Sequence, residues 1–317
     1  MSENTNKNSI AKEYYEGGNS PLTDAEWDAL YEGLEGIGYT PDSGVRHSFP
    51  MMSLKKTFDE DELGSWIASH EGQEVISSPK LDGSAVSILY DKGKFVRATT
   101  RGNGKIGIDV SNKMKFLVPE KINFAKKVQI DGEVVAPITI PNARNYAAGS
   151  LNLKLERDFI PRCNELRFVA YELRPHGFIE SWTVLLNWLE GLGFSTVHSV
   201  DASQYPTDGE VYRIDNIDYW TKQGFTSHHP RGSLAFKIQK EGVVTYLSNV
   251  EWQTGKSGVV TPVAILGPVM IGDALVSRAT LHNMAHIEEL GLEIGCNVEV
   301  IRSGEIIPRI VRRVEEK

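Results

Sequence analysis

The stretch that most constrains this chain is Ser77-Ser78-Pro79-Lys80-Leu81-Asp82-Gly83-Ser84, which lies between two segments with strand-like patterns. The segment after it, residues 85–96, contains an alternating run and an Asp-Lys-Gly turn, which together predict a hairpin. In extended chain, residues two apart point to the same side, so Lys80 and Asp82 are expected to share one face. Gly83 allows backbone or a ligand to approach closely, because it has no Cβ.

Lys80 is the candidate nucleophile of this stretch. A lysine must lose a proton before it can attack, and its free pKa is about 10.4. Burial beside other positive groups lowers such a pKa and activates the amine. Taken alone, a Lys-Leu-Asp-Gly tetrapeptide fits a solvated surface lysine better than a nucleophile, so the case depends on the rest of the sequence.

Composition limits the classes of protein that fit. A chain of 317 residues has room for about two or three domains. The net charge is −8 and residues 231–317 are neutral, so a large basic nucleic-acid surface is not expected. Cys163 and Cys296 are the two cysteines, too few for a disulfide framework or a four-cysteine zinc site, which fits a reducing cytoplasm. The polar N-terminus lacks a signal-peptide pattern, and no apolar run approaches the roughly 18 residues of a membrane span.

The pattern along the chain predicts three domains of an α+β protein. Residues 1–44 are expected to form a small helical module, with a capping box at Thr23–Glu26. Asp24 and Asp28 lie one turn apart in that module, where they stabilise a helix N-terminus or serve as ligands. Residues 45–240 mix short strands with a few helices. Residues 241–317 have the turn-rich, all-β pattern of an OB-type barrel.

Three further segments of the middle domain carry polar groups that could form a site. Thr99–Gly104 is a glycine-rich loop without the strand and helix of a P-loop. The strand predicted at Val128–Val135 contains Glu133, which lies either on a wet face or in a site, because buried carboxylates need a partner. The strand predicted at Ser233–Ile238 contains a second candidate lysine, Lys237. The His228-His229 pair lacks the partner spacing of a metal site.

Seen together, these segments resemble the N-terminal half of NAD+-dependent DNA ligases, from about Tyr14 to Ile310. The resemblance is carried by motifs in the same order as in that family: Lys80-Leu81-Asp82-Gly83, Thr100-Arg101-Gly102-Asn103-Gly104, Asp131-Gly132-Glu133-Val134, Asn142–Leu151, Val250–Gly258, Thr261–Ala264, Ala279–Asn283 and Arg302–Pro308. One such motif would be weak evidence, whereas the whole ordered set is specific.

The resemblance implies a nucleotidyltransferase (ATP-grasp-like) adenylation domain between the helical module and the OB barrel. Lys80 would attack NAD+ to give lysyl-AMP and nicotinamide mononucleotide (NMN). AMP would then pass to the 5′-phosphate of a nick in double-stranded DNA, and the 3′-hydroxyl would displace it, as in DNA repair and replication. Mg2+ would neutralise phosphate charge, held largely by substrate oxygens and water rather than by a protein cage.

The resemblance also implies the residues of the site. Glu133 would contact the ribose, Arg101 the nucleotide and Lys237 the phosphate. The backbone of Ser53 and Leu54 would line the adenine pocket. The other residues assigned to nucleotide binding are Ser78, Asp82, Arg144, Tyr171 and Arg213, and those assigned to NMN are Tyr14, Tyr15, Asp24, Trp27 and Asp28.

Several positions depart from the family pattern. Ser78 stands where a Glu is expected, and Arg213 stands where a Lys is expected, which is not a neutral exchange. Asn103 replaces an Asp in the glycine-rich segment. The remaining departures are Tyr15 for His, Trp27 for Tyr and Ile108 for Glu. Because Lys80, Glu133 and Lys237 are retained, adenylation is expected to survive.

Sealing is expected to need more than this sequence, because the family's zinc-finger and helix-hairpin-helix parts do not follow it. The chain is therefore expected to be either an excised fragment or the adenylation subunit of a split, bacteriophage-type ligase whose partner chain supplies those parts. Its expected location is the cytoplasm of a bacterium or a phage-infected cell. Two alternatives remain: a non-catalytic nucleotide-binding assembly subunit, and an ATP-dependent nucleotidyltransferase.

Overall fold

The computed structural model describes the part of the chain that carries the expected nucleophile, in two compact units that are taken separately here. The residues predicted to hold NMN (Tyr14, Tyr15, Asp24, Trp27 and Asp28) lie outside the described residues, so these predictions stay open. The described residues are 44–177, 179–237, 242–254, 260–271, 274–281, 283–303 and 307–314.

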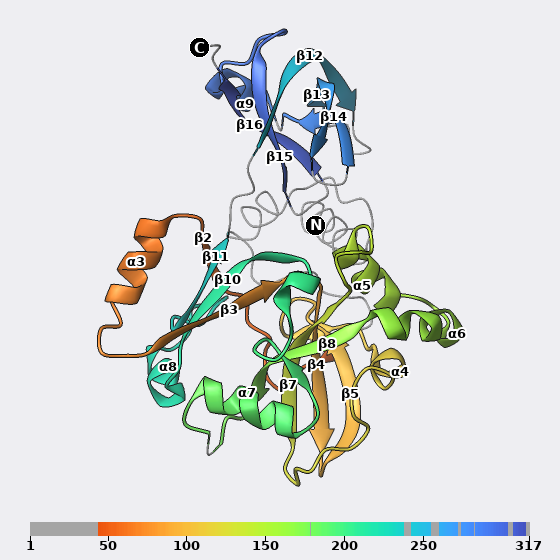
Figure 1. The fold of residues 1–317 in the computed structure, drawn as a ribbon, viewed down its shortest axis with the longest axis vertical. Coiled ribbons are helices and arrows are strands. Elements are labelled where there is room, and N and C mark those ends of the chain that lie inside the picture. The colour runs from red at the N-terminus through yellow and green to blue at the C-terminus, as the bar shows by residue number, and fades with distance from the viewer. Residues whose placement is uncertain are drawn as a thin grey trace, which may run out of the picture. The chain divides into compact units, whose positions relative to one another are not determined.

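The larger unit contains a five-stranded sheet in the order β5-β4-β7-β8-β9 (Figure 1). β4 and β5 form the predicted hairpin, and Lys92 and Gly93 of its turn both have positive φ, at 51° and 75°. Two positive φ values in succession suit the right-handed twist of the strands they join. The strands are β4 (Ser84–Asp91), β5 (Lys94–Thr100), β7 (Val128–Val135), β8 (Arg167–Arg174) and β9 (Ser195–Thr196).

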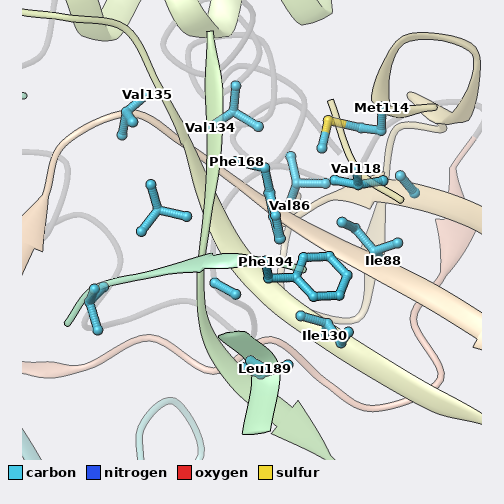
Figure 2. Packing of buried hydrophobic residues seen from close by; sticks show 14 of the residues in the cluster. Val86, Ile88, Met114, Val118, Ile130, Val134, Val135, Phe168, Leu189 and Phe194 are labelled. Atoms are coloured by element: carbon cyan, nitrogen blue, oxygen red, sulfur yellow. The ribbon is translucent and has the colours of Figure 1, made fainter. Parts of the chain in front are cut away.

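The two faces of this sheet differ in polarity. Val86 and Ile88 of β4 and Ile130 of β7 are fully buried, and they pack with helix residues such as Leu189 in the hydrophobic cluster of Figure 2. The residues that alternate with them lie on the opposite face. Ser87 on β4 and its cross-strand partner Asp131 on β7 are two of these. One face therefore makes the core, and the other is free to carry polar groups.

The second sheet of this unit contains Lys80. Its order is β2-β11-β10-β3, with β10 antiparallel to both β11 and β3 and β2 parallel to β11. β3 begins at Val75, where the sequence indicated a strand, and it runs on through Lys80 to Leu81. The strands are β2 (Lys55–Thr57), β3 (Val75–Leu81), β10 (Thr207–Ile214) and β11 (Ser233–Lys237).

Two helices of this unit begin at a residue whose side chain caps the first turn. Asp59 caps α3 (Glu60–Ala68), where its side chain accepts from Asp61 N, and Ser181 caps α7 (Trp182–Gly191). The apolar stripe of α7 is buried as expected from its helical spacing. The other elements are β1 (Val45–Arg46), β6 (Ile106–Gly107), α4 (Ser111–Met114), α5 (Ala143–Leu151), α6 (Glu156–Phe159), η1 (Ile160–Glu165), η2 (Ala202–Gln204) and α8 (Ile217–Gln223).

The smaller unit is a closed five-stranded barrel, which confirms the predicted OB-type architecture (Figure 1). Its core contains Leu247, Leu266, Val298 and Ile310, all nearly fully buried. A short helix, α9 (Met284–Glu289), lies between β14 and β15 in the chain. The strands are β12 (Val243–Thr254), β13 (Val260–Ile271), β14 (Ala274–Thr280), β15 (Asn297–Ser303) and β16 (Ile307–Val314).

No helix within the described ranges has the length and apolar character that a membrane span requires.

Candidate active site

Two lysines from different strands share one face of the second sheet. Gly209 of β10 pairs with Lys80 of β3 on one side and with Lys237 of β11 on the other. Directly opposed residues of antiparallel strands point to the same face. The sheet therefore places Lys80 and Lys237 on either side of a residue that has no side chain.

A β-bulge places an aspartate between these lysines. Thr207 pairs with Leu81 and Gly209 pairs with Lys80, so Asp208 is an extra residue in β10. Lys80 Nζ lies 2.9 Å from Asp208 Oδ1, and Lys237 Nζ lies 3.3 Å from Asp208 Oδ2. Burial alone would raise the pKa of the Asp208 carboxyl, but the two lysines outweigh burial and lower it. The cluster has two cations and one anion, which leaves it attractive to phosphate.

Glu133 lies near this cluster on β7 of the other sheet. Burial raises the pKa of its carboxyl to about 7, against the attraction of Lys80, Arg101 and Arg144. Asp82 raises the same pKa further. The structure therefore brings together six of the residues assigned to the site from sequence: Lys80, Asp82, Arg101, Glu133, Arg144 and Lys237. With a pKa of about 7, Glu133 changes its charge near neutral pH.

The chain after Lys80 is fixed by contacts to both neighbours. Asp82 N donates to Pro206 O at 2.8 Å, and the Asp82 carboxylate lies 3.0 Å from Arg144 Nε at the start of α5. A Cβ on Gly83 would lie 2.2 Å from the carbonyl oxygen of Val134. This glycine is required because the connection between β3 and β4 lies against the backbone of β7 here.

The glycine-rich loop supports the segment predicted to line the adenine pocket. Met51 N donates to Gly104 O at 2.8 Å, and Ser53 N donates to His228 O at 3.0 Å. Asn103 Oδ1 accepts from the backbone N–H groups of Lys105 and Ile106, at 3.0 and 2.8 Å. Only the side-chain oxygen is used in these bonds, so the exchange of Asp for Asn at this position preserves the turn.

The loop's arginine is held through its backbone. Arg101 N donates to Ala85 O at 2.9 Å, and His47 Nε2 lies 3.1 Å from Arg101 O. His47 Nδ1 in turn lies 2.7 Å from Ser87 Oγ on the polar face of the first sheet. These contacts fix the main chain that carries the Arg101 side chain, whose charge lowers the pKa of Glu133.

The other assigned residues lie further along the same faces. Ser78 is buried on β3 and pairs with Val211, two residues from Lys80. Tyr171 is an extra residue in β8, and its pKa is raised by burial and by the nearby charge of Glu133. Arg213 does not join the lysine cluster, because its side chain contacts Glu172, Trp182 and Trp220. Leu54 is half-buried in the segment between β1 and β2.

Asp208 is the residue of the cluster that the sequence assignment omitted. The sequence feature that could have identified Asp208 is the Asp208-Gly209 pair at the start of a strand, which repeats the Asp82-Gly83 pattern. The bulge that turns Asp208 toward the lysines has no recognisable sequence signature. Within the described residues, no group of three or more His, Cys, Asp or Glu side chains is arranged to hold a metal ion, and His228 and His229 lie in a loop.

The raised pKa of Glu133 leads to a prediction about stability. A carboxyl whose folded pKa is about 7 against an ordinary 4.5 favours the folded state below pH 4.5, and this contribution is lost as pH rises through 7. The loss is about 3 kcal/mol at most. Glu133→Gln removes this pH-dependent contribution. The unfolding free energy of the variant, relative to that of the wild type, should therefore be higher at pH 8 than at pH 5. Urea unfolding of both proteins at the two pH values measures this, and parallel pH profiles would contradict it.

Comparison with known proteins gives matches to both units. A family model described as the NAD-dependent DNA ligase adenylation domain matches residues 42–140, and one described as the NAD-dependent DNA ligase OB-fold domain matches residues 244–317. The chain is 32% identical to a DNA ligase of Alcanivorax borkumensis, over 96% of this chain and 48% of that protein. It is also 32% identical to a DNA ligase of Saccharophagus degradans, over 96% of this chain and 56% of that protein. The chain thus spans about half the length of the relatives it matches.

Proposed function

Because this chain belongs to the NAD-dependent DNA ligase family, we propose that it transfers AMP from NAD+ to Lys80 as the first step of nick sealing. The observation that carries the proposal is the cluster of Lys80, Asp208 and Lys237 on one sheet face, with Glu133 across from it. The cluster contains a nucleophile, a second cation to bind phosphate and a carboxylate for the sugar. Such sites catalyse by positioning and by stabilising charge.

The step is an in-line displacement at the adenylyl phosphorus. The lone pair of Lys80 Nζ forms the new P–N bond while the P–O bond to NMN breaks, and the electron pair leaves on the NMN phosphate. Asp208 accepts hydrogen bonds from Lys80 at 3.0 Å, so it orients the amine and lies within reach of the proton that Lys80 must lose. The positive charge of Lys237 then stabilises the negative charge on the phosphate oxygens.

Mg2+ is part of the proposal and fits the residues present. The described part of the chain offers no cage of protein ligands, while the phosphates of NAD+ and water provide the oxygens that Mg2+ prefers. Asp208, whose carboxylate lies 2.9 Å from Lys80 Nζ, would orient water on the ion. When bound, the ion would neutralise phosphate charge, and it would need no further protein ligand.

The test is intact-mass spectrometry under neutral conditions, because a P–N bond to lysine is labile in acid. The protein is first discharged with NMN, which reverses the step, and is then incubated with Mg2+ and either NAD+ or ATP. The proposal predicts an AMP-sized gain with NAD+ only. A gain with ATP alone would assign the chain to the ATP-dependent nucleotidyltransferases. No gain from folded, AMP-free protein would leave the non-catalytic binding subunit as the better description.

The proposal also names two partners, nicked double-stranded DNA as the substrate and a second protein chain that helps to bind it. The neutral C-terminal third offers little basic surface for a duplex, and tight binding to DNA depends on neutralising phosphates. We therefore expect adenylation by this chain alone, and efficient sealing of a nicked duplex only when zinc-finger and helix-hairpin-helix parts are supplied in trans. Gel assays of sealing with and without such a partner test this. Equal sealing without the partner would show that this chain is sufficient.

A further inference from the structure

A buried histidine links the glycine-rich loop to the sheet that carries Glu133. His47 directly follows β1, the short strand that pairs with β6 at the end of this loop. The two ring nitrogens of His47 face different elements. Nδ1 lies 2.7 Å from Ser87 Oγ on β4, and Nε2 lies 3.1 Å from Arg101 O in the loop. The ring therefore bridges a strand of the sheet and the main chain of the loop.

Burial keeps this ring neutral. It is the largest influence on the imidazole, and it lowers the pKa of His47 below the ordinary 6.5. The hydrogen bond to Arg101 O and the charge of Asp131 act in the opposite direction, while the charges of Arg174 and Arg97 lower the pKa further. At pH 7, one ring nitrogen therefore carries a hydrogen and the other does not.

The two contacts require one tautomer of the neutral ring. A carbonyl oxygen can only accept, so Nε2 carries the hydrogen and donates to Arg101 O. Nδ1 is then the acceptor. The Ser87 hydroxyl donates to Nδ1 at 2.7 Å rather than to Thr99 O, which is 3.5 Å away. His47 thus passes a chain of hydrogen bonds from β4 to the loop in one direction.

Both backbone groups of Arg101 are fixed relative to β4. Its N–H donates to Ala85 O at 2.9 Å, and Ala85 is the cross-strand partner of Glu133. Its carbonyl accepts from Gly104 N at 2.9 Å within the loop and from the ring of His47, which is held on β4. The imidazole therefore ties this carbonyl to the sheet, and the orientation of the peptide determines where the long Arg101 side chain points.

We propose that His47 is a positioning residue: its Nε2–H tautomer holds the Arg101 carbonyl and so directs the Arg101 side chain to the nucleotide beside Glu133. This inference rests on the proposed function, in which Arg101 contacts the nucleotide and Glu133 its ribose. The charge of Arg101 lowers the pKa of Glu133, as expected when the guanidinium lies near that carboxylate. Small displacements of such groups weaken binding and catalysis, because both depend on positioning.

The experiment compares His47→Gln with His47→Asn in the rate of adenylation against NAD+ concentration. A glutamine amide reaches the position of Nε2 and can donate to Arg101 O, whereas an asparagine amide reaches only the position of Nδ1 and can keep the bond to Ser87. We expect KM for NAD+ to rise by about tenfold in His47→Asn, the weight of one hydrogen bond, with kcat nearly unchanged. In His47→Gln the rise should stay below about twofold. Equal KM values for the two variants would overturn the inference.

Arg101→Ala tests whether the effect of His47 passes through the arginine. In that background, His47→Asn should cause no further rise in KM, because the group that it positions is already gone. An additive rise would mean that His47 acts on the nucleotide by another route, and the inference would be wrong.

Tyr90→Phe is the matched control for the loss of a buried hydrogen bond. Tyr90 lies on β4 as Ser87 does, but it belongs to the hydrophobic core, and its hydroxyl donates to Pro119 O at 2.5 Å. This variant should lower Tm and leave KM for NAD+ unchanged. If His47→Asn also lowers Tm without changing KM, the histidine is only structural and the inference is wrong.

The tautomer provides a readout that does not depend on activity. Long-range 1H–15N correlation spectra at pH 7, assigned with the spectrum of His47→Gln, should show the hydrogen of His47 on Nε2 alone. A hydrogen on Nδ1 would overturn the inference. Should the wild type fail to react with NAD+, the proposed function fails, and the inference is judged by thermal shift: AMP must raise the Tm of the wild type and of His47→Gln more than that of His47→Asn.

Discussion

Replacing Lys80 by arginine is expected to lower the rate of protein adenylation by at least about a thousandfold, because the covalent acceptor is lost. Arginine keeps the positive charge beside Asp208 and can still pair with its carboxylate. It cannot lose its proton at neutral pH and so cannot attack phosphorus. The variant thus separates the charge of Lys80 from its nucleophilicity.

Neutral-pH intact-mass measurement with NAD+ and Mg2+ gives the result, and Lys237→Arg is the matched control. Lys237 pairs with the same Asp208 but is assigned to phosphate binding, so its arginine variant should still gain AMP at a reduced rate. A Lys80→Arg protein that gains AMP at the wild-type rate would move the nucleophile elsewhere, with Lys237 as the first residue to test. Thermal unfolding should show that both variants are folded.

The sequence predicted those parts of the fold that depend on local pattern. Alternation predicted β4, and the residues Asp91-Lys92-Gly93 predicted the hairpin between β4 and β5. Each of these signals lies within about ten residues of the element it specifies. The barrel was predicted for the same reason, from short β-patterned segments separated by turn residues.

The site depends on contacts that no local pattern encodes. Lys80 and Asp208 are 128 positions apart, and they meet because β10 lies beside β3 and carries one extra residue. Glu172 and Arg213 come from different sheets, so neither strand's sequence identifies the other as its partner. The resemblance to a family supplied candidate residues, whereas the contacts of Asp208 with Lys80 and of Glu172 with Arg213 required the topology.

Replacing Gly83 by alanine is expected to lower the unfolding free energy by about 3 kcal/mol and to reduce adenylation as well. The new Cβ would lie 2.2 Å from Val134 O and 3.1 Å from Val134 C. Both are backbone atoms of β7, so neither can move aside as the end of a flexible side chain could. Relief of the clash must separate β7 from the chain that follows Lys80, and this moves Glu133, the residue before Val134, relative to the lysine.

Gly64→Ala is the matched control, because it makes the same chemical change where nothing lies within 4 Å of the new Cβ. Gly64 lies within helix α3, where alanine is preferred over glycine by about 1 kcal/mol, so this variant should be slightly stabilised. Urea unfolding of both variants, with the adenylation rate measured on the folded fraction, tests the argument. If Gly83→Ala were as stable and as active as Gly64→Ala, the close approach of β7 would not be what requires glycine after Lys80-Leu81-Asp82, and the position would have to be explained by direct contact with the nucleotide.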